Sequence, residues 1–210
     1  MSDLDIQPLT PERFGDLAAL FEEGGDPKWC WCTYFRVRGR DWSNSTAESN
    51  RAELESRAGD DPPAGLLAYD GDRVVGWVSL GPRTTYERLE ASRVLAPVDE
   101  RPAWSIVCFV VSRSARGRGV ARAMLDAAIR HAKAHGATLL EAYPVDTAGE
   151  RVPAANAYRG TLRMFEAAGF TEVARRRANA SSPERPIVRL EIRPADLRHP
   201  SRQGDRRPPG

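Results

Sequence analysis

The sequence predicts one α+β domain with a central mixed, mostly antiparallel twisted sheet flanked by helices. Three features carry this prediction: a hairpin signal in residues 64–80, an amphipathic helix between apolar runs at 105–111 and 138–143, and two further strand-like runs near the end of the chain. Strands and helices in such an order are typical of a sheet covered by helices. We expect the domain to span residues 1–193 and a tail to follow at 194–210.

The N-terminal quarter is predicted to form one strand and two helices. Residues 4–9 form a short strand, and Thr10 before a proline is a typical helix start. Ser45 and Glu48 have the spacing of a capping box, which predicts a second helix that ends near residue 58. The first helix would bury one apolar face, formed by Phe14, Leu17, Ala18, Leu20 and Phe21.

The next segment contains the clearest local signal, a β-hairpin. Strands are predicted at 64–69 and 73–80, joined by a tight turn at 70–72 that contains a glycine between two aspartates. Residues 82–103 are predicted to form a long loop or an irregular helix, with its most helical part at 86–93.

A long amphipathic helix follows the 105–111 strand. Its apolar residues recur with the 3.6-residue period of one helix face, and Gly136 is a typical stop signal. Arg122 and Asp126 lie on the opposite face at a spacing that favours ion pairs. The apolar face comprises Ala121, Met124, Leu125, Ala128, Ile129 and Ala132.

The C-terminal part is predicted to complete the sheet. Because a helix connects them, the strands at 105–111 and 138–143 should run parallel. A short helix at 160–168 and an antiparallel strand pair at 170–177 and 187–192 complete the order β-α-α-β-β-β-α-β-α-β-β.

The turn at 116–122, between the apolar strand and the amphipathic helix, is the most informative motif. Its glycines allow successive backbone N–H groups to converge, and the helix start adds unpaired donors, so the turn is suited to phosphate. It lacks the lysine of a Walker loop and the glycine spacing of a Rossmann loop. The alternative interpretation is a helix-capping turn with incidental glycines.

Arg116, Gly119 and Ala121 fit the pattern Arg-x-x-Gly-x-Ala, which resembles the acyl-CoA pyrophosphate loop of the GNAT family of N-acetyltransferases. Residues 164–170 resemble the end of that family's fourth helix, and the element order is similar over about residues 3–193. The resemblance implies the GNAT fold, acetyl-CoA as cosubstrate and no metal.

The resemblance also implies which residues bind the cosubstrate. Three strand residues would pair with its pantetheine arm through backbone groups, and one of their N–H groups would stabilise the oxyanion. From the sequence alone, the same run is equally a buried strand. The implied cosubstrate residues are Phe109, Val110, Val111, Arg116, Gly117, Arg118, Gly119, Val120, Ala121 and Arg122.

The chain departs from the family pattern where the general acid is expected. Phe165 stands in the place of the tyrosine that protonates the departing thiolate in many relatives, and phenylalanine has no proton to donate. The asparagine seven residues earlier is replaced by Tyr158. Tyr158 is therefore a candidate catalytic residue, and the alternative is that it packs against the short helix. A thiolate is a tolerable leaving group, so a missing acid need not abolish turnover.

Glu141 is the candidate general base. It is the one charged residue in the apolar run 138–143 and matches a position that serves as base in some relatives. Burial raises the pKa of a carboxyl group towards the range useful to a base. The alternatives are a glutamate that faces the sheet surface and proton transfer through water.

The three cysteines suit a reducing compartment. The pair Cys30 and Cys32 lacks the usual Cys-x-x-Cys spacing and a second pair, which disfavours a metal site. In a strand-like or irregular segment both thiols would lie on one side, with Trp29 and Trp31 on the other. Cys108 is interpreted as a small buried residue rather than an acyl-carrying nucleophile.

Composition excludes several other classes. No apolar stretch approaches the roughly 18 residues that span a membrane, and the acidic start does not resemble a signal peptide. The net charge of +2 arises in the tail at 194–210, where we expect disorder. The tail lacks the aromatic platform of a nucleic-acid binder, so we expect no nucleic-acid partner.

We therefore expect a cytoplasmic N-acetyltransferase that transfers acetyl from acetyl-CoA to a primary amine of a small molecule. The amine would attack directly, with Glu141 or water as proton acceptor. Segments 28–42 and 82–103 should form the acceptor side, where many aromatic residues indicate a small or amphipathic amine. The alternatives are a catalytically silent acyl-CoA-binding or sensor module and an acetyltransferase of protein N-termini or lysines. A homodimer is compatible with the sequence.

Overall fold

The computed structural model describes residues 4–23, 25–148 and 158–192; the predicted tail lies outside them. Its strands form one seven-stranded sheet in the order β1-β2-β3-β4-β5-β7-β6, in which β4 and β5 are parallel and the other described neighbours are antiparallel. This confirms the predicted fold class. The strands are β1 (Asp5–Pro8), β2 (Gly65–Asp70), β3 (Arg73–Pro82), β4 (Trp104–Val111), β5 (Leu139–Ala142), β6 (Thr171–Arg176) and β7 (Arg185–Glu191).

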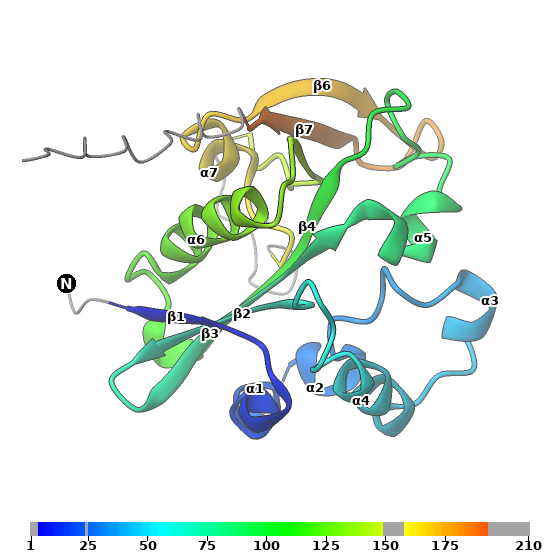
Figure 1. Cartoon of the computed structure of the whole chain (residues 1–210). Coiled ribbons are helices and arrows are strands. Elements are labelled where there is room, and N and C mark those ends of the chain that lie inside the picture. The colour runs from blue at the N-terminus through cyan, green and yellow to red at the C-terminus, as the bar shows by residue number, and fades with distance from the viewer. Residues whose placement is uncertain (1–3, 24, 149–157, 193–210) are drawn as a thin grey trace, which may run out of the picture.

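Helices cover both faces of the sheet: α1, α2 and α4 lie on one face, and α6 and α7 lie on the other (Figure 1). None of the helices within the described ranges has the length and apolar character needed to span a membrane. The α-helices are α1 (Phe14–Glu22), α2 (Pro27–Cys30), α3 (Gly39–Trp42), α4 (Ala47–Ser56), α5 (Glu87–Glu90), α6 (Val120–Ala134) and α7 (Leu162–Glu166). Three 3-10 turns are η1 (Pro11–Arg13), η2 (Arg83–Thr85) and η3 (Arg113–Ala115).

The packing of α6 against the sheet depends on a glycine in β3. Met124 and Val120 approach Gly76 so closely that a Cβ there would lie 2.8 Å from the Met124 sulfur and 2.9 Å from a Val120 methyl group. A side chain at this position would push the helix off the sheet. The buried face of α6 is the predicted one with a small rotation, because Val120 and Ala127 are buried while Ala121 and Ile129 are partly exposed.

The parallel strands β4 and β5 separate after a short paired region. Their pairing ends at Ile106 and Ala142, whereas β4 continues to Val111. The second half of β4 therefore has one edge that no strand covers. The chain segment 158–161 enters this gap: the Phe109 N–H donates to the Tyr158 carbonyl (2.5 Å).

The cap of α4 differs by one residue from the prediction. Thr46 is the N-cap: its hydroxyl accepts from the Ser49 N–H at 3.1 Å, and the Ser49 hydroxyl accepts from the Thr46 N–H at 2.8 Å. The Ser45 hydroxyl instead donates to the Trp42 carbonyl at 2.9 Å, which ends the short helix α3. The predicted capping box with Glu48 is wrong because a second hydroxyl residue follows Ser45 and takes its role.

The segment around the first two cysteines also differs from the prediction. It forms the helical turn α2, which ends at two consecutive left-handed residues, Trp31 (φ 47°) and Cys32 (φ 52°). This reversal buries Trp31 while Trp29 stays 45% exposed, so the two tryptophans do not share a side. The Cys32 sulfur lies 2.9 Å from that of Cys108 in β4, and burial raises the pKa of the Cys32 thiol well above its usual range.

Candidate active site

A cavity of about 590 Å³ lies where the loop before α6 meets the open edge of β4. Its lining contains all the predicted cosubstrate residues except Arg118. It also contains Tyr158. The predicted base Glu141 is absent from its lining. The cavity is lined by Leu20, Glu23, Gly25, Asp26, Pro27, Phe109, Val110, Val111, Ser112, Arg113, Ala115, Arg116, Gly117, Gly119, Val120, Ala121, Arg122, Tyr158, Gly160 and Met164.

The loop at 116–122 presents a series of free backbone donors. Gly117 (φ 76°) and Gly119 (φ 81°) are left-handed, a conformation that glycine adopts without strain. In the part of the chain that the structure describes, no acceptor takes any N–H group of residues 116–122. Alternating left-handed residues ahead of a helix form a concave nest of N–H groups that binds anions, and the α6 macrodipole adds partial positive charge. The loop therefore fits a diphosphate.

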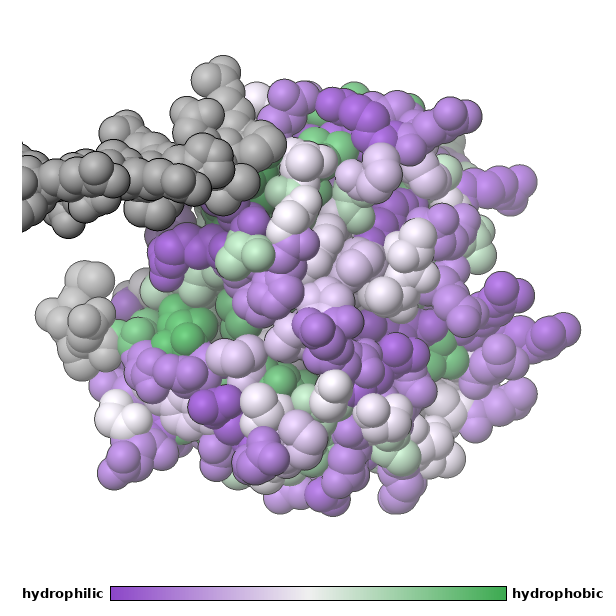
Figure 2. Space-filling model, in the orientation of Figure 1, coloured by the Kyte–Doolittle hydropathy of each residue, from purple (hydrophilic) through white to green (hydrophobic). Residues whose placement is uncertain are grey.

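Arg118 points to the other side of this loop. It forms an ion pair with Asp70 at 2.8 Å and lines a second cavity, together with Leu4 and Val75 among others. Figure 2 shows a hydrophobic hollow over β1 on a face that is otherwise mostly hydrophilic. Arg118 thus braces the loop against the β2–β3 turn, while Arg116 and Arg122 line the main cavity.

The open edge of β4 has an alternating pattern of backbone groups. The Ser112 N–H donates to the Val75 carbonyl (3.0 Å), so the backbone groups of Val110, two residues earlier, also face β3. Those of Phe109 and Val111 face the gap. The Val111 N–H and carbonyl are therefore placed to pair with an extended chain, and the Phe109 N–H holds the Tyr158 carbonyl.

Tyr158 lies beside this edge. Its ring packs against the cluster of hydrophobic residues that includes Cys108, and its hydroxyl makes no hydrogen bond within the described ranges. Burial raises the pKa of the Tyr158 phenol, so its proton is retained at neutral pH. Phe165 does not line the cavity: it is fully buried and packs edge-to-face against Phe109 and Phe170.

Glu141 is at the centre of a buried network of charges. Its Oε1 accepts from Arg83 at 2.8 Å and from the Tyr143 hydroxyl at 2.7 Å, and its Oε2 accepts from Arg189 at 2.8 Å. The carboxylate is fully buried. Both of its oxygens are thus held by donors from β5, β7 and the turn after β3.

Glu141 neutralises one of the two guanidinium charges around it. Carboxylates at the edge of the network compensate the other. Asp99 accepts from Arg189 at 2.7 Å, and that hydrogen bond lowers the pKa of Asp99 to about 2. Arg83 lies 2.9 Å from a carboxylate oxygen of Glu90 and donates to the carbonyls of Leu89 and Leu95. The network therefore fixes the 83–99 segment to the sheet.

Comparison with known proteins identifies the fold. The sequence profile of the Acetyltransferase (GNAT) family matches residues 28–161, which is more than half of the chain. The chain belongs to this family. It is an acetyl-CoA-dependent acetyltransferase by that membership, and the predicted resemblance is confirmed. No curated protein matches the sequence.

Solved GNAT structures share the architecture at low sequence identity. An acetyltransferase of the GNAT family from Streptococcus pneumoniae is 18% identical, with a TM-score of 0.54 over 90% of this chain and 99% of that one. A polyamine N-acetyltransferase from Drosophila melanogaster is 12% identical, with a TM-score of 0.56 over 90% and 100%. A protein from Salmonella typhimurium, described as an acetyltransferase and solved with acetyl-CoA, is 18% identical, with a TM-score of 0.53 over 90% and 93%.

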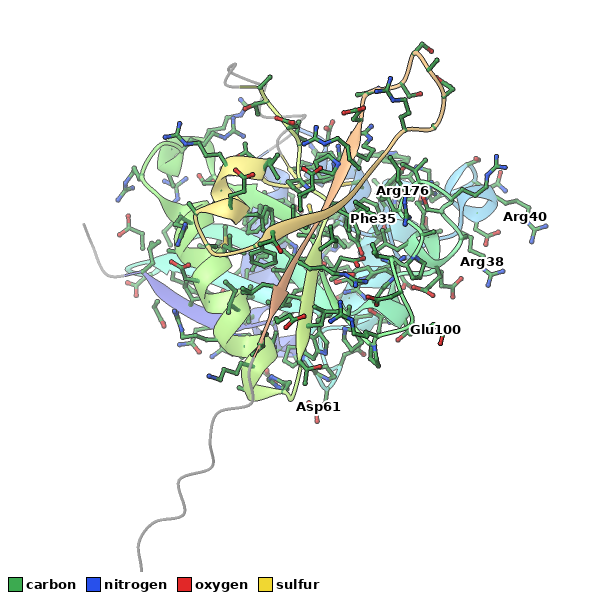
Figure 3. All side chains as sticks on the ribbon, turned by 90° about the horizontal axis from the view of Figure 1, so that it is seen from above. Phe35, Arg38, Arg40, Asp61, Glu100 and Arg176 are labelled. Atoms are coloured by element: carbon green, nitrogen blue, oxygen red, sulfur yellow. The ribbon has the colours of Figure 1, made fainter. Side chains whose placement is uncertain are left out.

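Within the GNAT fold, the two segments predicted to form the acceptor side contact each other. The Arg88 N–H donates to the Phe35 carbonyl at 3.0 Å, and the Arg88 side chain donates to the Val37 carbonyl at 3.1 Å. The Arg88 guanidinium lies 4.1 Å from the centre of the Tyr34 ring. Arg38 and Arg40, on the outer part of the same segment, point away from the molecule (Figure 3).

Four buried arginines of the described residues escaped the sequence prediction, and one of them, Arg36, donates to the Ala64 carbonyl and the Tyr86 hydroxyl at 3.3 Å. Arg83 and Arg189 hold Glu141, and Arg159 follows Tyr158 in the gap between β4 and β5. No local pattern marks them, because the partners of Arg36, Arg83 and Arg189 are distant in sequence and the described residues offer none to Arg159. The one available signal was the isolated charge of Glu141 in an apolar strand, which requires a buried partner.

Proposed function

We propose that the chain acetylates a primary amine of a small molecule, with acetyl-CoA bound in the 590 Å³ cavity. This proposal rests on one observation: the loop with free N–H groups at 116–122 and the open edge of β4 line the same cavity. The loop would hold the diphosphate, and the Val111 backbone would pair with the pantetheine arm as an added strand does.

The Phe109 N–H is the proposed donor to the thioester carbonyl. It faces the gap and is already aligned with a carbonyl oxygen, that of Tyr158 at 2.5 Å. The acetyl oxygen would take the place of the Tyr158 carbonyl, so the donor is preorganised for an oxyanion. The amine then attacks the carbonyl carbon, and the carbon–sulfur bond breaks.

We propose water as the acceptor of the amine proton. Glu141 was the other candidate, but both of its oxygens accept short hydrogen bonds from cationic or phenolic donors, and it does not line the cavity. Its proposed role is to position Arg83 and Arg189. Proton relay through water is a common route in general base catalysis.

Tyr158 is the proposed proton donor to the departing thiolate. The Tyr158→Phe variant should lower kcat by about 10-fold, which is less than the roughly 10²- to 10⁴-fold typical of general acid–base catalysis because the leaving group is good. The KM for acetyl-CoA should not change. The measurement is steady-state release of free thiol. An unchanged kcat would mean that water, rather than Tyr158, protonates the departing thiolate.

The overall proposal is tested with labelled acetyl-CoA and a panel of amines, read by mass spectrometry. Gly119→Ala should weaken acetyl-CoA binding by about 10-fold or more, because a Cβ would intrude on the phosphate cradle. Gly136→Ala is the matched control: Gly136 is also left-handed (φ 78°) with open space around it, but lies at the other end of α6. Tight acetyl-CoA binding without transfer to any amine would instead establish a silent acyl-CoA-binding module.

A further inference from the structure

Arg159 is a buried cation to which the described residues offer neither a hydrogen-bond acceptor nor an ion-pair partner. Its exposed fraction is 7%, and in the described part of the chain its side chain makes no hydrogen bond or ion pair. The Nε atom is completely buried without an acceptor. Burying an unpaired guanidinium is costly, so such a group requires an explanation, and a ligand that supplies the missing acceptor is one.

The backbone holds Arg159 next to the proposed point of acetyl transfer. The Phe109 N–H donates to the carbonyl of the preceding residue, Tyr158, and the Val145 N–H donates to the carbonyl of the following residue, Gly160, at 2.9 Å. These two bonds attach the segment to β4 on one side and to the chain after β5 on the other. When the acetyl oxygen replaces the Tyr158 carbonyl on the Phe109 N–H, the bond from Val145 to Gly160 still holds Arg159 near the gap.

The side chain of Arg159 lies near Tyr158 and interacts electrostatically with Tyr34, which belongs to the predicted acceptor segment 28–42. Its guanidinium lies 5.7 Å from the centre of the Tyr158 ring. Burial lowers the pKa of Arg159, and the neighbouring Arg185 lowers it further, while Tyr158 and Tyr34 act in the opposite direction. Arg159 does not line the cavity assigned to acetyl-CoA, so the phosphates of that molecule are not its counter-charge.

Among the described residues, the surroundings contain further positive charge, and we find no carboxylate there that is free of another partner. Arg88, which stacks on Tyr34, has a buried Nη2 atom without a hydrogen-bond partner. The carboxylates on adjacent elements are engaged: Glu87 pairs with Arg38, and Glu184 pairs with Arg175 and Arg177. We call Arg159 and Arg185 the arginine cluster.

We propose that the arginine cluster binds a carboxylate of the acceptor, with Arg159 as its main ligand. The acceptor would then be an amine that also carries a carboxylate, as an amino acid does. A guanidinium matches a carboxylate with two parallel N–H donors, and Tyr34, 37% exposed, offers an aromatic surface to an apolar side chain. This inference rests on the proposed amine acetylation, which it deepens.

The test compares amines that differ only in the carboxylate. Three pairs serve: L-phenylalanine with phenethylamine, L-leucine with isopentylamine, and L-lysine with cadaverine. In the pair that is acetylated fastest, the carboxylate member should have the higher kcat/KM by about 10- to 100-fold, as expected for one or two charge-assisted hydrogen bonds. Arg159→Gln should remove this preference, and Arg159→Lys should keep part of it.

Two controls separate a binding role from a structural one. Arg130→Gln removes an exposed arginine on α6 and should leave the preference unchanged. In the presence of CoA, the preferred amino acid should raise the Tm of the wild type but not that of Arg159→Gln. Equal kcat/KM values within every pair, with transfer otherwise intact, would overturn this inference alone. Absence of transfer to all six compounds, with the Tm shift retained, would overturn the proposed function instead.

Discussion

Two groups of buried arginines differ in what surrounds them. Arg83 and Arg189 are 6% and 5% exposed, and Arg159 is 7% exposed, so all three are removed from water to the same extent. The first two share the Glu141 carboxylate and have further acceptors, whereas Arg159 has none in the described residues. A buried charge that is fully paired within the protein supports the fold, and one that is left unpaired points to a ligand.

The paired group joins elements that would otherwise be independent. Arg83 follows β3, Glu141 lies in β5 and Arg189 lies in β7, so three parts of the sheet meet at one carboxylate. Each oxygen of Glu141 already accepts from a cationic donor. A proton taken up there would weaken both ion pairs, and this argues for a positioning role rather than a catalytic one.

The largest expected effect is the loss of the central carboxylate. Glu141→Ala leaves Arg83 and Arg189 buried around an empty position and should lower the free energy of unfolding by about 3–5 kcal/mol. Urea denaturation measures this change. Glu100→Ala, which removes an exposed glutamate (Figure 3), is the control and should change it by less than about 0.5 kcal/mol. Similar values for the two variants would contradict the structural role of Glu141.

A smaller effect is expected at the edge of the same network. The Tyr143 hydroxyl donates to Glu141 at 2.7 Å and contacts the Ser105 hydroxyl at 2.9 Å. Tyr143→Phe keeps the ring but removes these bonds, so it should cost about 1–3 kcal/mol of stability. Thermal and urea unfolding would both report it. A change as large as that of Glu141→Ala would mean that Tyr143, rather than the carboxylate, organises the network.

The smallest expected effect on stability belongs to the unpaired arginine. Arg159→Gln removes a buried charge that has no partner, so the free energy of unfolding should stay within about 0.5 kcal/mol or increase. Calorimetry of the free protein would measure it. A loss of several kcal/mol would show that Arg159 supports the fold and would remove the contrast with Arg83 and Arg189.

The sequence predicted those parts of the molecule whose signal is local. The period of α6, the glycine turn before it and the hairpin at β2–β3 were each predicted as elements of structure, because each depends on residues a few positions apart. The short helices α2 and α3 were missed since four residues contain too little of a helical period, whereas α5 lies within the range 86–93 that was predicted to be helical.

The contacts among the buried charged residues could be found only once the fold was known. Arg83 is 58 residues from Glu141 and Arg189 is 48 residues from it, and only the sheet order, with β5 between β4 and β7, brings them together. The contact of Cys32 with Cys108, 76 residues apart, arises in the same way. That Arg159 lacks a partner is a property of the whole structure and leaves no trace in the local sequence.

The most direct test measures kcat/KM and the free energy of unfolding together on Glu141→Gln and Arg159→Gln, at a temperature where both are folded. The account predicts that one variant loses stability and the other loses kcat/KM. Glu141→Gln should be destabilised but keep kcat/KM within about threefold, whereas Arg159→Gln should keep its stability and lose about 10- to 100-fold in kcat/KM for a carboxylate-bearing amine. A folded Glu141→Gln without turnover would contradict the account and make Glu141 the base.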